Sequence, residues 1–168
     1  MDSVLTQVLK DLKDTRLRSE IIDCANIKAF KKGEILQMEG KPIKAVIIVL
    51  KGSVKVVMPY EDRKEFLLYY INPGGTCARG VLVSSNEGLS PIKLICEQAG
   101  EALFIPIQNA LSWIGRFPTF TYFVLNAYEC HIQNLVRSMY QGQTQSFSKR
   151  IWAFLDRKRS SMTILILQ

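Results

Sequence analysis

Apolar residues close to the start of the chain recur at a helical spacing. After Ser3 they stand at Val4, Leu5, Val8, Leu9 and Leu12, three or four positions apart, as on one face of an α-helix. Ser3 is of a residue type that caps helix N-termini. The pattern therefore predicts an N-terminal helix over residues 3–14.

From about Ile27 the pattern changes to short strand-like runs separated by turn residues. The runs cover residues 34–38, 45–50, 53–58, 65–71, 92–97 and 102–106. Glycine, proline and charged residues separate them, as in Asn72-Pro73-Gly74-Gly75. Strands that recur about every ten residues with such turns predict an antiparallel sandwich or barrel-like roll. Lys51-Gly52, between two β-branched runs, is predicted to be a hairpin turn.

After Pro106 the spacing becomes helical again, and Pro118 is suited to the first turn of a helix. Alternating intervals of three and four residues form a heptad seam: Leu125, Tyr128, Ile132, Leu135 and Met139. A second stripe lies beside it: Phe120, Val124, Ala127 and His131. A single stripe would suit a helix docked on its own domain. Two stripes indicate contacts on two sides, and a symmetric partner is the simplest second contact, so we expect a homodimer.

The last residues have the pattern of the start of another domain. Polar residues and Gly142 interrupt the helix at 141–145, a further helical segment follows at 148–157, and an apolar run ends the chain at 162–168. One helix and a strand-sized stub cannot bury a core. We therefore expect a truncated second domain. Its basic residues lie between Lys149 and Arg159, where nucleic acid is a plausible partner.

Composition restricts the class of protein further. The chain has 168 residues, 48% hydrophobic, and a formal net charge of +7. Its four scattered cysteines and the lack of a signal peptide predict reduced thiols in a cytoplasmic protein, and no apolar stretch is long enough for a membrane span. A single histidine, His131, excludes the multi-histidine metal sites of β-roll oxygenases, and Cys24 alone cannot hold an iron–sulfur cluster. We expect no enzyme activity, no metal and no cofactor.

The order of elements and several motifs resemble the cyclic-nucleotide-binding superfamily, and specifically the Crp/Fnr regulators of bacteria. The resemblance rests on Phe30-Lys31-Lys32-Gly33-Glu34, Val49-Leu50-Lys51-Gly52-Ser53, Asn72-Pro73-Gly74 and Phe104-Ile105-Pro106. It implies an α+β fold, a jelly-roll-like β-roll with an N-terminal helix and a long C-terminal dimerisation helix. The implied division is a sensor domain at 1–115, a dimerisation helix at 116–141, and a hinge with the truncated start of a winged helix-turn-helix domain at 142–168.

The resemblance also locates a ligand site, a phosphate-binding cassette between two strands. Its equivalents here are Gly74, Gly75, Thr76, Cys77, Ala78, Arg79, Ser90 and Pro91. The family's usual glutamate falls on Arg79, its arginine on Ser90 and its serine or threonine on Pro91. Without the arginine, a buried phosphate would lack its counter-charge, at a cost of several kcal/mol, unless Arg79 turned inward to supply the cation. Cys77 could be a redox-sensitive thiol, although a small apolar filler is the commoner role of a buried cysteine.

These observations predict the effector-sensing and dimerisation portion of a Crp/Fnr-type transcription regulator that does not bind cyclic AMP tightly. The effector would be an unidentified small molecule, and the longer protein would bind DNA through the missing domain. A stand-alone module of the same fold that regulates a protein partner is the alternative.

Overall fold

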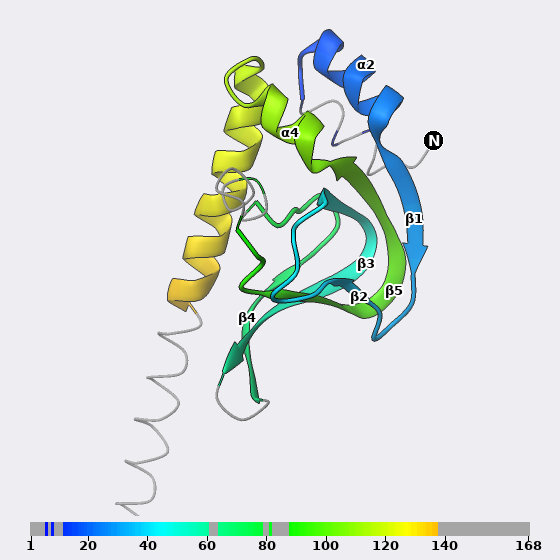
Figure 1. Cartoon of the computed structure of the whole chain (residues 1–168). Coiled ribbons are helices and arrows are strands. Elements are labelled where there is room, and N and C mark those ends of the chain that lie inside the picture. Colours follow the sequence, from blue (N-terminus) through cyan, green and yellow to red (C-terminus); the bar gives the residue numbers. More distant parts are fainter. Residues whose placement is uncertain are drawn as a thin grey trace, which may run out of the picture. The chain divides into compact units, whose positions relative to one another are not determined.

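The computed structural model describes residues 6, 8, 12–60, 64–78, 81 and 88–137. The chain divides into two compact units, Met1–His131 and Ile132–Gln168. Most of the helix predicted at 3–14, and the whole segment predicted at 142–168, lie outside the described residues. The first unit holds the elements shown in Figure 1: α2 (Thr15–Cys24), β1 (Asn26–Phe30), β2 (Ile35–Gln37), β3 (Ala45–Tyr60), β4 (Lys64–Ile71), β5 (Lys93–Pro106) and α4 (Ile107–Trp113).

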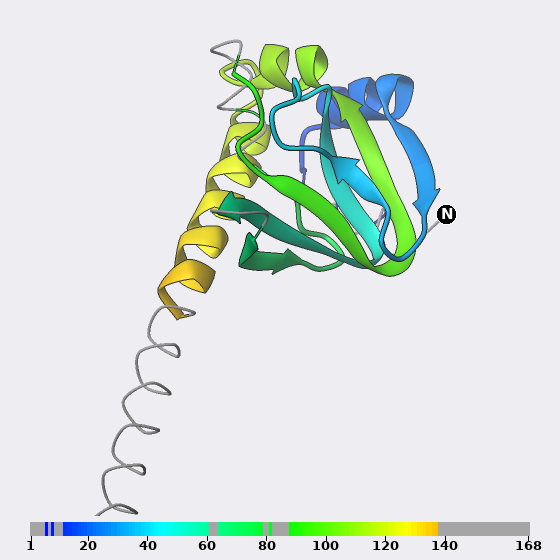
Figure 2. The same ribbon diagram turned by 60° about the horizontal axis from the view of Figure 1, so that its bottom comes forward.

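The described strands form one antiparallel sheet, in the order β1-β5-β3-β4, with β2 also paired to β5. Figure 2 shows the long strands β3 and β5 side by side. A sheet of this kind with helices before and after it is an α+β β-roll, so the predicted fold class is confirmed.

The predicted hairpin at Lys51-Gly52 is wrong, because β3 continues through these residues and pairs with β5 on both sides of them. Gly52 has a φ of 79°, and a Cβ there would lie 2.6 Å from the Ala99 carbonyl oxygen. A Cβ at Gly100 of β5 would lie closer still to the Lys51 carbonyl oxygen. The glycines let two long, bulged strands approach each other, and the register shifts between Val49 and Lys51 and again after Lys51.

The helix α2 was not predicted, whereas α4 agrees with the helical spacing predicted after Pro106. In α2, Asp14 caps the N-terminus by accepting hydrogen bonds from the Arg16 and Leu17 amides at 2.9 and 3.2 Å. Only Leu17 and Ile21 of this helix are buried, so its apolar stripe is too thin to be recognised in the sequence. The short helix α4 directly follows β5 and buries Trp113 completely.

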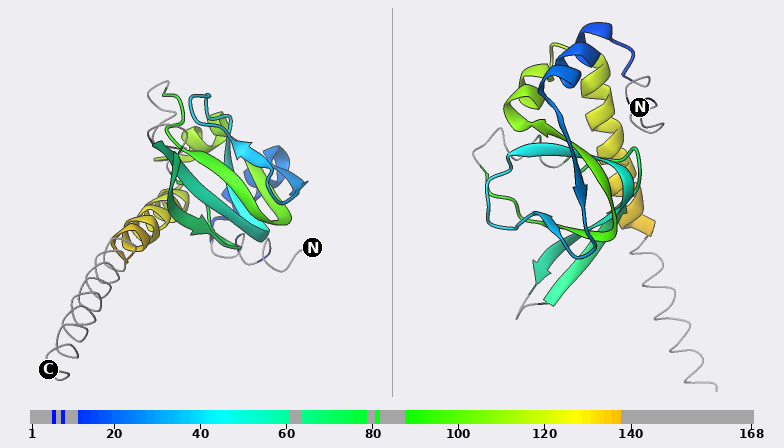
Figure 3. Two further views of the ribbon diagram at one scale, coloured as in Figure 1. Left: turned by 90° about the horizontal axis from the view of Figure 1, so that it is seen from below. Right: turned by 90° about the vertical axis from the view of Figure 1, so that its right-hand side faces the viewer.

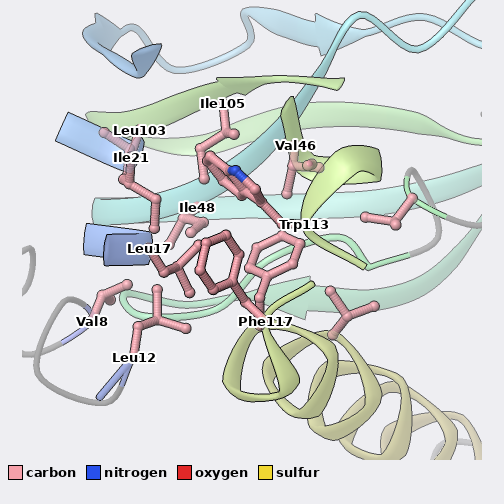
Figure 4. Packing of buried hydrophobic residues seen from close by; sticks show 14 of the residues in the cluster. Val8, Leu12, Leu17, Ile21, Val46, Ile48, Leu103, Ile105, Trp113 and Phe117 are labelled. Atoms are coloured by element: carbon pink, nitrogen blue, oxygen red, sulfur yellow. The ribbon is translucent and has the colours of Figure 1, made fainter. Parts of the chain in front are cut away.

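The hydrophobic core lies between the helices and one face of the sheet. Alternate residues of β3 and β5, such as Val46, Ile48 and Ile105, contact Leu17 of α2 and Trp113 of α4 (Figure 4). Their neighbours in sequence point to the other face of the sheet. This alternation leaves the second face free to form the interior of the roll.

Trp113 also packs against the first residues of the long helix. This helix begins at Pro118, as predicted, and is described to residue 137. The Trp113 ring meets Phe120 edge to face, with 5.2 Å between centroids, and its Nε1 donates to Glu20 at 2.6 Å. Glu20 in turn pairs with Arg116 at 2.9 Å.

Candidate functional site

The segment equivalent to the cassette begins directly after β4 and lies against β3. Gly74 has a φ of 85°, which turns the chain so that its amide donates to the Val49 carbonyl at 2.8 Å. The Val49 amide donates back to the Gly75 carbonyl at 3.0 Å, and Thr76 forms an isolated bridge with Ile48. The backbone of this segment is therefore fixed by β3.

The two buried polar side chains of the described region, Thr76 and Ser90, both belong to the site, with exposed fractions of 1% and 2%. The Thr76 hydroxyl donates to the Ile47 carbonyl, and the Ser90 hydroxyl donates to the Ile92 carbonyl, each at 2.8 Å. These donors already satisfy buried backbone acceptors, so using them for a ligand would leave a carbonyl without a partner.

Cys77 and Ala78 complete the described part of the segment, and both are buried. The Cys77 sulfur lies 3.7 Å from the Tyr69 hydroxyl, and either group can donate in this contact. Ala78 is part of the hydrophobic core. Pro91 is half-buried, and Arg79 lies outside the described residues.

The structure brings Cys77 and Ser90 together around a small cavity of about 20 Å³. Eight residues line it, including Ile47, Ile92 and Leu94, and none of the eight carries a charge. A volume of this size holds about one water molecule, whereas sites for small molecules measure about 300–1,000 Å³. Among the described residues of the cassette equivalent, the side chains around Cys77 and Ser90 therefore leave room for about one water molecule between them.

His131 of the long helix makes an aromatic contact with β4, next to the cassette equivalent. The rings of His131 and Tyr69 stack, with centroids 4.1 Å apart and an angle of 15° between the planes. Burial lowers the pKa of His131, and a hydrogen bond with the Thr76 backbone acts weakly in the opposite direction. His131 therefore contacts both β4 and the cassette equivalent. The sequence predicted no role for Tyr69, which is the residue of β4 that stacks on His131.

The side chains of the two stripes on the long helix differ in burial. Phe120 and Val124, from the second stripe, are buried against the roll. Of the predicted seam, Leu125 and Ile132 are 57% and 54% exposed. The remaining seam residues lie elsewhere: Tyr128 and Leu135 are half-buried, and Met139 is outside the described residues.

Two further apolar residues extend the exposed stripe. Tyr122 and Val136 are 69% and 60% exposed, and they stand at helical spacing from Leu125 and Ile132. We call Tyr122 and Leu125, the two of these exposed residues that belong to the first unit, the outer stripe. In sequence, its Leu125 stands three residues before the half-buried Tyr128.

A rolled antiparallel sheet, a cassette-like segment against β3 and a helix that contacts this segment are the features of a cyclic-nucleotide-binding fold. Residues 27–116, more than half of the chain, match the cyclic nucleotide-binding domain, and the chain belongs to this family. A search of curated proteins gave no match. Among the described helices, none is long and apolar enough to cross a membrane.

Solved structures with the same fold include bacterial regulators. A transcriptional regulator assigned to the Crp/Fnr family from Eubacterium rectale matches with a TM-score of 0.70 and 16% identity over 88% of this chain and 68% of its own. A mutant of CooA from Carboxydothermus hydrogenoformans gives 0.62 and 19%, over 80% and 83%. The sensor domain of the transcriptional regulator DNR from Pseudomonas aeruginosa gives 0.63 and 14%, over 81% and 93%. The chain thus resembles the sensor domains of Crp/Fnr regulators.

Proposed function

We propose that this chain is the effector-sensing and dimerisation portion of a Crp/Fnr-type transcription regulator, and that it does not bind cyclic AMP with high affinity. The observation that carries the proposal is the combination of a tightly packed ligand-site segment with an exposed apolar helix surface. The described residues of the cassette equivalent pack closely around Cys77 and Ser90, while the helix that contacts them keeps apolar side chains exposed. In this proposal, DNA binding would belong to a further domain of a longer protein.

Dimerisation is supported by the outer stripe. Large apolar side chains that recur along one face of a helix suit a parallel or antiparallel partner helix. Phe120 and Val124 of the second stripe are already buried against the roll. The outer stripe therefore remains exposed and could contact a second copy. A two-fold axis would place the outer stripes of both protomers against each other.

Weak binding of cyclic AMP is supported by volume and charge together. A nucleotide would have to displace Ile92 and Leu94 from their packing, and the cavity offers no cation to its phosphate. An uncompensated buried charge costs several kcal/mol, which is comparable to the whole binding energy of a micromolar ligand.

The contact between His131 and the segment at Thr76 supports a route for signalling. A change in this segment would move a ring that is stacked on Tyr69 and carried by the helix. An effector that prefers one helix arrangement by a few kcal/mol would then shift the population of dimer states.

Isothermal titration of the full chain with cyclic AMP tests the negative part of the proposal. We expect no binding tighter than about 100 μM, which corresponds to about 5.5 kcal/mol. Micromolar binding would refute it, and would show that Arg79 neutralises the phosphate. Sedimentation tests the positive part: a monomer at high micromolar concentration would favour a stand-alone module that regulates another protein.

A further inference from the structure

A larger pocket lies on the first unit beside the small cavity, with which it shares Gln37, Ala45 and Ile47. Its volume is about 430 Å³, within the range of small-molecule sites. Residues of β1, β2, β3 and β5 line it, together with the turn between β2 and β3. Figure 3 (right) shows this turn at the edge of the roll, and β2 pairs with the first residues of β5. No residue of 74–78 or 90–91 is part of its lining.

The strand register builds an apolar floor for this pocket. Phe104 of β5 pairs with Ile47 of β3 on one side and with Asn26 of β1 on the other. Ala45 and Pro106 form the next row along the same face. These positions alternate with the core residues of the same strands, so the floor lies on the face of the sheet turned away from the helices.

Three lysines surround the floor: Lys28, Lys41 and Lys44. No aspartate or glutamate is among the lining residues. The ion pairs found in the described part of the chain use Lys51, Lys55, Lys93 and Arg116, and none of the three pocket lysines. The pocket therefore combines an apolar surface with a concentration of positive charge that the lining does not neutralise.

The backbones that carry the three lysines are fixed. Lys28 lies in β1, and its ammonium stands 5.5 Å from the centre of the Phe104 ring. The Lys41 carbonyl accepts from the Ser90 amide at 2.9 Å and from the Gln37 side chain at 3.3 Å. The Lys44 carbonyl accepts from the Ile107 amide at 3.0 Å. Only the flexible side chains remain to be ordered when an anion binds, which limits the entropic cost.

We propose that this pocket binds a small organic anion, a carboxylate or phosphate on a flat apolar body. The apolar body lies against Phe104 and Ile47, and the anionic group lies among the ammonium groups of Lys28, Lys41 and Lys44. The site is independent of the sensor role proposed above, because it needs neither a dimer nor a DNA-binding domain. Its contact with Ile47, whose carbonyl accepts from Thr76, places it next to the cassette equivalent.

The experiment is a titration of the full chain with 2-naphthoate, 2-naphthyl phosphate, 2-naphthamide and inorganic phosphate, followed by ligand fluorescence or calorimetry. We expect saturable binding of at least one naphthyl anion with a dissociation constant below about 1 mM. The uncharged amide, which has nearly the same shape, should bind at least tenfold more weakly. Inorganic phosphate should also bind at least tenfold more weakly, because it cannot use the apolar floor. The two naphthyl anions distinguish a carboxylate from a phosphate site.

Matched variants locate the binding. Lys28→Met, Lys41→Met and Lys44→Met keep an unbranched side chain and remove one charge each, and each should weaken binding at least fivefold. Lys32→Met makes the same change at an exposed position outside the pocket and should alter affinity less than twofold. No saturable binding of either anion, equal binding of the amide, or an equal effect of Lys32→Met would overturn the proposal.

Discussion

Replacement of Leu125 by alanine tests the assignment of the outer stripe as a dimer surface. Burial of a whole leucine side chain contributes about 1.5–3 kcal/mol. Since 57% of Leu125 is exposed, roughly 1–1.7 kcal/mol remains to be gained per protomer by covering it. In a two-fold symmetric dimer, Leu125 of both protomers is covered, so this free energy is gained twice. Alanine retains part of the contact, so we expect a loss of roughly 2 kcal/mol, a dimer dissociation constant raised about 30-fold.

Sedimentation equilibrium over a range of protein concentrations measures this constant. Asn126→Ala is the matched control, because Asn126 is exposed on the same helix but lies about 100° around it from Leu125. The control should leave the dissociation constant within about twofold, since surface substitutions away from a contact change little. An unchanged constant in Leu125→Ala, or an equal loss in Asn126→Ala, would show that another surface forms the dimer.

Two further predictions concern stability, measured by urea unfolding at fixed protein concentration. Because burial lowers the pKa of His131, the only histidine, the unfolded chain takes up its proton first as the pH falls below about 6.5. The free energy of unfolding should therefore decrease from there downward, and His131→Phe should flatten this dependence between pH 7 and 5.5; an unaltered slope would contradict the assignment. Gly52→Ala should cost several kcal/mol more than Gly33→Ala, since both have positive φ but only the Gly52 Cβ would meet backbone atoms. Equal costs would mean that φ alone requires glycine at 52.

Periodicity predicted the type of most elements correctly, because each buries one face. Its errors have physical causes. Glycine in a turn and glycine at a close crossing of two strands look the same in the sequence. The sequence therefore predicts a turn at Gly52, whereas the structure has a continuous strand there. Only the position of Gly100 on the neighbouring strand distinguishes the two, and that contact joins residues far apart in the chain.

The candidate site was predictable only in part. The replacements at Ser90 and Pro91 were visible in the sequence, and they indicated the loss of a cation. The filling of the cavity by Ile92 and Leu94 was not, because it depends on how two strands and a loop meet. The pocket with three lysines was also missed. Lys28 belongs to one strand, and Lys41 and Lys44 belong to the approach to another, and lysines are common at exposed positions.

Strand alternation explains how the chain can keep the fold of the family while its cassette residues depart from the family pattern. Ile48 of β3 packs in the core, whereas Ile47 on the opposite face lines the small cavity. The cavity side chains Ile92 and Leu94 are outside the core cluster, so their identity can change without removing the packing that holds the roll to its helices. The reverse change is harder. An arginine at Ser90 would have to occupy a position that is 2% exposed, beside a cavity of about 20 Å³, and would lose the hydrogen bond to the Ile92 carbonyl. A phosphate site therefore needs smaller side chains at the cavity as well as a new cation, and a single substitution at Ser90 would destabilise the roll before it bound a nucleotide.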